Sequence, residues 1–466
     1  MGTPKLMLGN RVPVFPLWSM PLTLKYPRFC CHMHCLGVSG TGKSKWLESI
    51  FLQLFQQRIG ISFIDPHGDS ADALLSYLLQ LDLLEKNRSR LLYIEFQEDN
   101  YFLPWNILKQ DALPHAIAGL FKEAMHRAWP ALSGGAAPMF DTLIQDGVKV
   151  LISAGLPITS LYRLLTDKAY RDQLLQHERD WDVVSFFHDQ YDRLSTREQV
   201  DQAGAALRRA HLLTFSPVLK YSLGQQENVL DIAQLIDSGV SVIYNLSRVQ
   251  DQEVRRLLGC FLSILYEQAA LSRDGTTRQR TQHHLIVDEM GEFVSQSEQG
   301  LSRILSQARK SNFFVILAHQ TWSQATERLR GALQNCQISV VFGVGREDAE
   351  RQARNIGRVN IERIKHEVAN ETALERTHPL YESVPEQWEE QIQHLVDLKP
   401  RHAVVRGRGM QPVEIKTLTM PKIRVSLEQV DKIKQYYRDK IMKRKDEIIL
   451  SHHQGQSLQS HTVRSK

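Results

Sequence analysis

The pattern of apolar and polar residues predicts alternating strands and helices near the start of the chain. Apolar runs at 33–36, 61–64 and 91–96 are short and end in turn residues, as buried strands do. Between the first two runs, residues 45–57 place their apolar side chains on one face of a helix. Strands that alternate with helices in this way predict a parallel α/β sheet.

The pattern changes after residue 108. Strand signals nearly vanish over residues 109–225, and helical periodicity replaces them at 139–152, 159–165 and 183–194. We therefore expect an inserted all-helical domain. Strand-like runs then resume at 241–246, 284–287, 313–318, 338–342, 403–405 and 413–418, with helices at about 253–271, 301–310 and 346–356 between them.

This organisation predicts four segments in the 466 residues. Residues 1–108 form the first part of a nucleotide-binding domain, and 109–225 form the helical insertion. Residues 226–424 complete the nucleotide-binding domain, and 425–466 form a charged helix followed by a disordered polar tail.

Composition narrows the class of protein only a little. The net charge of +5, from 57 basic and 52 acidic residues, permits a nucleic-acid partner without arguing for one. The cysteines are odd in number and irregularly spaced, which indicates reduced cytosolic thiols. Cys30 to Cys35 include two histidines but lack a second ligand pair, so we expect a buried strand there rather than a metal site. No apolar run approaches the ~20 residues that span a bilayer, so we expect a cytoplasmic protein that docks on a membrane only through a partner.

The most specific signal is a phosphate-binding loop. Residues 37–44 fit the pattern G-x-x-x-x-G-K-[ST] at every position, between a predicted strand and a predicted helix. Backbone N–H groups of such a loop surround phosphates, and the helix N-terminus adds its positive dipole. The predicted ATP-binding residues are Gly37, Val38, Ser39, Gly40, Thr41, Gly42, Lys43 and Ser44, with Lys43 on the β- and γ-phosphates and the Ser44 hydroxyl on Mg²⁺.

An acidic pair supplies the expected second half of this site. The apolar strand 285–287 ends in Asp288 and Glu289. We predict that Asp288 contributes to binding nucleotide and Mg²⁺, and that Glu289 activates a water against the γ-phosphate. A glutamate at this place indicates ATP hydrolysis rather than phosphoryl transfer to a small acceptor.

Further polar residues follow neighbouring strands. Gln320 follows the strand 313–318, and we assign it as a sensor of the γ-phosphate, with a simple polar strand end as the alternative. Arg309 and Lys310 end the preceding helix; either both complement its dipole, or one of them, Arg309, acts as an arginine finger for another subunit. The cluster of Asp65, His67 and Asp69, at a strand end near the nucleotide, either supports the site indirectly or forms a turn.

Taken together, these motifs resemble the HerA/FtsK branch of P-loop motors, and most closely the TraG/TraD-like coupling ATPases of conjugation and type IV secretion. The resemblance extends over about residues 30–420. It rests on the order and spacing of His34, the phosphate loop, 64–69, 104–108, 164–167, Tyr170-Arg171, 244–247, 308–310, 318–320 and 344–349.

The resemblance implies a RecA-like P-loop core in a ring, usually a hexamer, with ATP between subunits and single- or double-stranded DNA in the pore. It also implies that Arg309 acts in trans, and that the helical insertion recognises DNA or a relaxase. Secretion-channel proteins are the other expected partners. The sequence departs from the pattern in two respects: it has no transmembrane helices, and the ~35 residues before the loop are too few for the β-barrel of HerA-type motors.

The leading hypothesis is an ATP-driven DNA translocase for conjugation, type IV secretion or mobile-element transfer. A HerA-like motor for DNA end processing or phage defence, with a nuclease or effector partner, is one alternative. An ATP-dependent DNA- or protein-binding switch that moves nothing is the other. Basic residues such as Arg208, Arg209 and the 432–445 segment do not identify the DNA contacts, because charge runs commonly form solvated faces.

Overall fold

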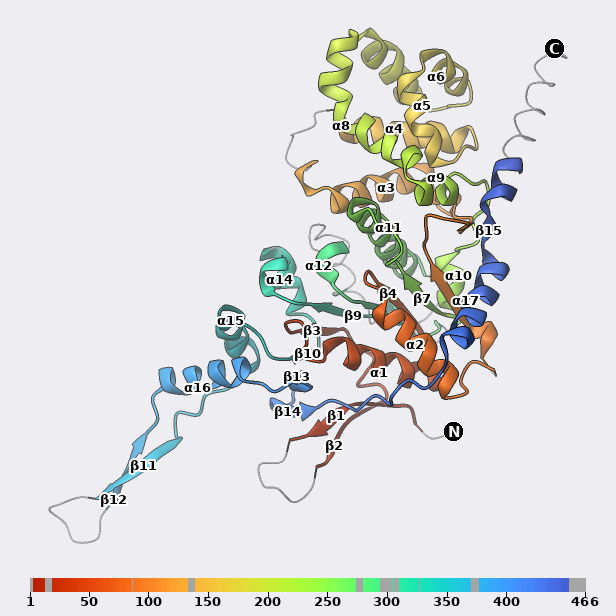
Figure 1. The fold of residues 1–466 in the computed structure, drawn as a ribbon. Helices are drawn as coiled ribbons and strands as arrows, with labels where there is room; N and C mark the ends of the chain where they lie inside the picture. The colour runs from red at the N-terminus through yellow and green to blue at the C-terminus, as the bar shows by residue number, and fades with distance from the viewer. Residues whose placement is uncertain are drawn as a thin grey trace.

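A computed structural model describes residues 3–12, 19–85, 87–132, 139–273, 280–293, 305, 310–325, 327–369 and 377–451. The described residues form an 11-stranded sheet in the order β2-β1-β14-β13-β10-β3-β9-β8-β4-β7-β5 (Figure 1). Its strands are β1 (Lys5–Arg11), β2 (Pro21–Lys25), β3 (Met33–Leu36), β4 (Gly60–Asp65), β5 (Leu91–Glu95), β7 (Ser241–Asn245), β8 (His283–Val287), β9 (Phe313–His319), β10 (Ile338–Val341), β13 (His402–Gly407) and β14 (Val413–Lys416).

The seven strands from β10 to β5 are parallel. Every residue of β3, β4, β7, β8 and β9 is buried. Such continuous burial is typical of a parallel sheet that is covered on both faces. The carboxyl ends of the central strands therefore meet at one edge, where the phosphate loop also begins. The predicted α/β class with a mainly parallel sheet is confirmed.

Helices cover the two faces of the sheet (Figure 1). One apolar core lies under α1 and α2 and extends to α17, and a second lies under α11, α12, α14 and α15. Neighbouring residues of β4 belong to different cores, Phe63 to the first and Ile64 to the second. These helices are α1 (Lys43–Gln56), α2 (Asp69–Gln80), α10 (Ile232–Asp237), α11 (Gln252–Leu271), α12 (Met290–Phe293), α14 (Glu327–Leu333), α15 (Arg346–Ile356), α16 (Val384–Val396) and α17 (Leu427–Ile441).

The N-terminal residues extend the sheet, which the sequence pattern did not predict. β1 and β2 form a hairpin, and β1 pairs antiparallel with β14. β14 pairs in turn with β13, and β13 with β10, so four antiparallel strands continue the parallel part. β14, the partner of β1, lies about 400 residues further along the chain. A local sequence pattern carries no information about such a distant pairing.

The described elements between Pro114 and Leu223 are helical and lie together at one end of the molecule (Figure 1). They rest on the core through α3 and α11, where buried Arg127 donates to both carboxylate oxygens of Glu267, at 2.8 and 2.7 Å. The exact domain boundaries stay a prediction. The helices are α3 (Pro114–Ala128), α4 (Phe140–Ser153), α5 (Leu161–Thr166), α6 (Lys168–Leu175), α7 (Trp181–Ser185), α8 (Thr196–Phe215) and α9 (Pro217–Leu223).

The predicted charged helix after residue 425 is α17, but it is not a simple solvated face. Ser426 begins it with a capping box, and the Lys434 side chain is buried against the sheet. Lys434 Nζ lies 2.7 Å from Asp72 Oδ1 and 3.3 Å from Glu95 Oε1. Because these carboxylates belong to α2 and β5, α17 is fixed to the core by charge pairs. The tail predicted to be disordered lies, beyond residue 451, outside the described residues.

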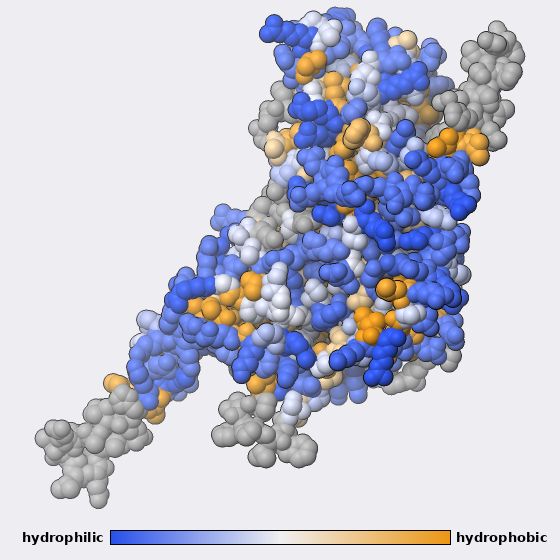
Figure 2. Space-filling view, viewed as in Figure 1, coloured by the Kyte–Doolittle hydropathy of each residue, from blue (hydrophilic) through white to orange (hydrophobic). Residues whose placement is uncertain are grey.

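Two smaller sheets complete the described chain: β6 (Tyr101–Phe102) pairs with β15 (Lys443–Arg444), and β11 (Ile364–Ala369) with β12 (Thr377–Tyr381). The β11–β12 hairpin projects from the body next to α16 (Figure 1). The face shown in Figure 2 is mostly hydrophilic. None of the described helices combines the length and the apolar character needed to cross a bilayer.

Candidate nucleotide-binding site

The phosphate loop joins β3 to α1, and strands on both sides hold its backbone. Gly37 N–H donates to the His319 carbonyl at 3.3 Å, and Val38 N–H donates to the Gly343 carbonyl at 3.0 Å. On the far side, Arg401 N–H donates to the Thr41 carbonyl at 2.7 Å. These bonds fix a loop that has no regular secondary structure of its own.

Two glycines give the loop its curvature. Gly40 and Gly42 have φ of 82° and 101°, in the left-handed region that other residues avoid. A Cβ on Gly42 would also lie 3.3 Å from the Arg401 backbone, whereas a Cβ on Gly40 would meet nothing within 4 Å. The loop is therefore tight against Arg401 and open at Gly40. Ser39, directly before Gly40, lies on the exposed part of the loop.

Helix α1 begins at Lys43, which directs its buried side chain back toward the loop. Lys43 Nζ donates to the Gly37 carbonyl at 3.4 Å and lies 3.1 Å from Glu289 Oε1. Ser44 donates its hydroxyl to Asp288 Oδ2 at 3.3 Å. The structure thus brings the loop residues together with the acidic pair that the sequence placed in the same site.

Asp288 and Glu289 follow β8, and both are buried. Burial raises the pKa of the Asp288 carboxyl to about 6, with smaller contributions from the carboxylates of Glu289 and Asp65, while Lys43 opposes this shift. Glu289 has φ of 50°, a left-handed conformation that costs a non-glycine residue about 1–2 kcal/mol. Its N–H donates to Asp288 Oδ1 at 3.0 Å.

This acidic environment fits Mg²⁺. The carboxylates of Glu289 and Asp65 add to the effect of burial in raising the pKa of the Asp288 carboxyl, so acidic groups are gathered at this place. The Ser44 hydroxyl and the Asp288 carboxylate supply the hard oxygen atoms that Mg²⁺ prefers. These two residues are the ones that would hold the ion.

Gln320 lies where the sensor was predicted, directly after β9. Its Nε2 donates to Glu289 Oε1 at 2.9 Å, the same oxygen that faces Lys43. One carboxylate oxygen therefore connects the phosphate loop with the end of the neighbouring strand. The predicted finger, Arg309, lies outside the described residues.

A buried histidine pair lies beneath the loop. The Nε2 atoms of His34 and His319 are 2.6 Å apart, and His319 Nδ1 lies 2.8 Å from the Thr321 carbonyl. A carbonyl only accepts, so His319 is protonated at Nδ1 and, when neutral, accepts at Nε2; His34 is then the donor. Burial lowers the pKa of His319 to about 4 and that of His34 well below its usual range. The sequence marked His34 through the resemblance but gave no sign of this pairing.

The other candidate clusters have structural roles. Asp65 accepts from His67 N–H at 2.9 Å and from Ala71 N–H at 2.8 Å, so its carboxylate holds the turn into α2.

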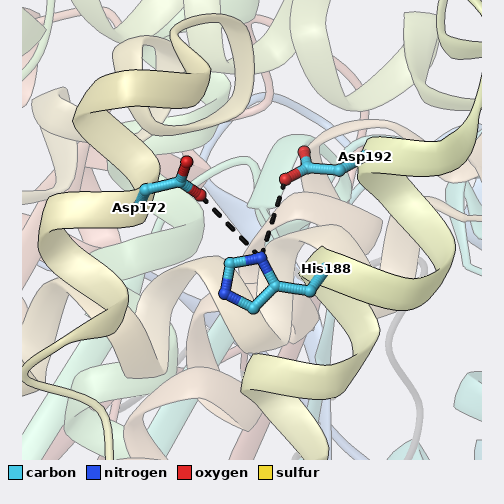
Figure 3. A group of neighbouring side chains, drawn as sticks. All are labelled: Asp172, His188 and Asp192. Atoms are coloured by element: carbon cyan, nitrogen blue, oxygen red, sulfur yellow. Dashed lines mark ion pairs between the residues drawn. The ribbon is translucent and has the colours of Figure 1, made fainter.

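In the described chain, Asp172, His188 and Asp192 form a group with metal-like spacing (Figure 3). Asp192, however, already pairs with Arg171 and with Lys168, the latter at 2.6 Å. These cations neutralise the cluster, which explains it as a salt-bridge network.

Cys30, Cys31 and Cys35 form no disulfide bond within the described chain. Cys35 lies in the buried strand β3, as expected, whereas Cys30 and Cys31 lie in the turn just before it.

Comparisons with known proteins agree with this geometry. A family model described as the TraM recognition site of TraD and TraG matches residues 282–386. No curated protein matches the sequence significantly. Among solved structures, the unbound bacterial conjugative coupling protein TrwBΔN70 is similar with a TM-score of 0.57 and 15% identity, over 87% of this chain and 89% of that one.

Two further structures have the same fold. TrwB in complex with ADP and Mg²⁺ is similar with a TM-score of 0.56 and 15% identity, over 86% of this chain and 88% of that one. VirB4 of Thermoanaerobacter pseudethanolicus is similar with a TM-score of 0.53 and 14% identity, over 84% of this chain and 90% of that one. The predicted RecA-like P-loop fold and the resemblance to TraG/TraD-like proteins are thereby confirmed.

Proposed function

We propose that this chain is an ATP-hydrolysing motor that moves DNA in conjugative transfer or type IV secretion. The observation that carries the proposal is the convergence of Lys43, Ser44, Asp288, Glu289 and Gln320 at one edge of a RecA-like sheet. The similarity in fold to conjugative coupling proteins, one of them solved with ADP and Mg²⁺, supports the choice of nucleotide and of task.

The proposed chemistry follows from the contacts of Glu289. Its carboxylate can accept the proton of a water that attacks the γ-phosphate, and Gln320, 2.9 Å away, holds that carboxylate in place. Lys43 binds the β- and γ-phosphates, and backbone N–H groups of residues 37–42 surround them. Mg²⁺, when bound through Ser44 and Asp288, supplies positive charge to the phosphate oxygens.

We propose that the chain assembles into a ring of identical subunits, most simply a hexamer, as the resemblance implies. The chain contains one phosphate loop, so an arginine that approaches the γ-phosphate from outside the site must come from another copy. We assign that role to Arg309, in accord with the resemblance; such fingers contribute on the order of 10³–10⁵ in rate. DNA in the pore, a relaxase and secretion-channel proteins are the proposed partners, and the last would place the motor at the inner membrane.

A displacement assay tests the proposed movement. A protein block is attached to one end of a DNA molecule, and its release is followed with ATP, with a non-hydrolysable analogue, and with Glu289→Gln. We expect release only with ATP and an intact Glu289. Release that is equal with the analogue would show binding without translocation and would contradict the proposal.

A further inference from the structure

A large cavity lies at the end of the sheet away from the phosphate loop. Its volume is about 640 Å³, within the range of ligand sites. Gln337 and Gly407 line it, at the place where Ile338 begins β10 and pairs with both Met33 and Gly407. Because β3 runs from this end toward the loop, the cavity is separate from the nucleotide site.

Arginines dominate the charge of this cavity. Arg354, Arg358, Arg406 and Arg408 line it. Arg354, Arg358 and Arg408 are exposed, while Arg406 is partly buried and donates to the Asn355 carbonyl. In the described part of the chain, none of the four forms an ion pair with a carboxylate. We call the cavity that these four arginines line the arginine cavity.

The neighbouring arginines show that this lack of acidic partners is specific to the cavity. Arg346 and Arg351, on the same helix α15, pair with Glu389 and Glu347, each at 2.8 Å. Arg363, just before β11, pairs with Glu382 at 3.0 Å. Acidic side chains are therefore plentiful nearby, yet they compensate the arginines outside the cavity.

A buried amide supplies a second, independent sign of a ligand. Gln352 lines the cavity and is only 2% exposed, and its Nε2 has no hydrogen-bond partner among the residues that the structure describes. An unpaired buried donor costs about 1–3 kcal/mol, so a ligand that offers oxygen atoms would be favourable here. The guanidinium groups likewise only donate. The site therefore selects for an anion rich in acceptors.

We propose that the arginine cavity binds the phosphate backbone of the DNA that the motor moves. Arginine matches phosphate geometry through paired N–H donors. The exposed guanidinium groups lie where a polymer can reach them. Among the described residues, the aromatic rings that line the cavity are those of His34 and Trp322, and both are buried, so they offer bases no surface on which to stack. Binding is therefore independent of sequence and sensitive to salt. This inference rests on the proposed function.

A chain of contacts leads from this cavity to the hydrolytic residues. His34 lines the cavity and contacts His319 through Nε2, at 2.6 Å. His319 directly precedes Gln320, which donates to Glu289. A phosphate in the cavity would thus be two side chains away from the residue that senses the nucleotide, which gives DNA a physical route to the rate of hydrolysis.

The test compares two variants that each lose three positive charges. In the first, Arg354, Arg358 and Arg408 are all changed to alanine; in the control, the paired residues Arg346, Arg351 and Arg363 are changed instead. Binding of labelled single- and double-stranded DNA is measured by fluorescence anisotropy across a salt series, without ATP turnover. Thermal unfolding and the oligomeric state are measured in parallel.

We expect the first variant to bind DNA about tenfold or more weakly. Its affinity should depend less steeply on salt, because roughly two fewer counterions are released on binding. Its thermal unfolding temperature should be unchanged. The control should bind as the wild type does. If the wild type binds DNA and both variants bind it equally well, the inference about the arginine cavity is overturned, but the proposed function is not. Loss of the oligomer in the first variant would also overturn it, since the arginines would then contact a neighbouring subunit. No DNA binding by the wild type would overturn the proposed function as well.

Discussion

Lys43 Nζ lies 3.1 Å from Glu289 Oε1, and both side chains are buried. A buried charge needs a partner, so in this structure each residue satisfies the other. Phosphate oxygens that bind Lys43 would replace Glu289 as its partner. The Glu289 carboxylate would then be left to Gln320 and to water. Binding of ATP and preparation of the base are therefore expected to occur together.

The first prediction concerns Lys43. Lys43→Ala should reduce ATP affinity at least tenfold and abolish turnover, because the loop loses its positive charge and Glu289 loses its partner. Lys432→Ala is the control, since Lys432 forms an exposed pair with Glu428 at 2.7 Å, far from the loop. Titration with a fluorescent ATP analogue measures the ATP affinity of both variants, and an ATPase assay measures their turnover. Normal turnover by Lys43→Ala would refute the site.

Removal of the base should separate binding from hydrolysis. Glu289→Gln keeps an acceptor for Gln320 but cannot take a proton, so kcat should fall by about 10²–10⁴. ATP affinity should stay the same or increase, because Lys43 no longer has a competing carboxylate. Single-turnover hydrolysis and equilibrium binding test this directly. If hydrolysis is unchanged, the base lies elsewhere.

Gln320 should affect the rate more than the binding. Gln320→Ala removes the 2.9 Å contact with Glu289, and we expect kcat to fall by roughly tenfold, with ATP affinity almost constant. Thr321→Ala, one residue further on, is the control and should retain most activity. An equal loss of affinity and rate in Gln320→Ala would show that Gln320 only supports the fold.

The histidine pair predicts sensitivity to acid. The folded pKa of His319 is about 4, below the usual 6.5, so the unfolded chain takes up a proton that the folded chain does not. The contribution of His319 to the free energy of unfolding is fully present above about pH 6.5 and is lost as the pH falls toward 4. Asp288 acts in the opposite sense, because its pKa of about 6 lies above the usual 3.8 and its contribution is lost as the pH rises through that interval.

Comparison of variants isolates the histidine contribution. His34→Gln retains a donor for His319 but removes one titrating group, so the decline of stability with acid should become shallower by up to roughly 1.4 kcal/mol per pH unit. His177→Gln, at an exposed position, is the control. Urea unfolding from about pH 7 to about pH 5 is the measurement. Identical slopes for both variants would contradict the buried neutral pair.

Helix α17 should contribute to stability through Lys434. Lys434→Ala leaves the buried Glu95 carboxylate with one partner fewer, and we expect a loss of about 3 kcal/mol in the free energy of unfolding. Lys432→Ala, on the same helix, should change it by less than about 1 kcal/mol, because its pair with Glu428 is exposed. Chemical denaturation distinguishes the two. Equal effects would mean that α17 is not fixed by charge.

Much of the site could be predicted because parallel strands bring their carboxyl ends to one edge. The phosphate loop after β3, the acidic pair after β8 and Gln320 after β9 each follow an apolar run, and local patterns show such runs well. Their mutual contacts then follow from topology. The catalytic roles assigned to them stay predictions, as does that of Arg309.

The features that sequence could not give depend on contacts between distant segments. β1 pairs with β14, Lys434 pairs with Asp72, and His34 pairs with His319, each across hundreds of residues. The arginine cavity is likewise assembled from α15 and the end of β13. A charge run looks the same in the sequence whether it is solvated, as at Lys432, or buried, as at Lys434.

The most direct test of the central claim is the ATPase rate with and without single- and double-stranded DNA, across a salt series, with Lys43→Ala as the control. A DNA-coupled motor predicts that DNA stimulates hydrolysis, that the stimulation fades as salt increases, and that Lys43→Ala shows neither. Hydrolysis that neither form of DNA stimulates, at a protein concentration where rings are present, would contradict the account.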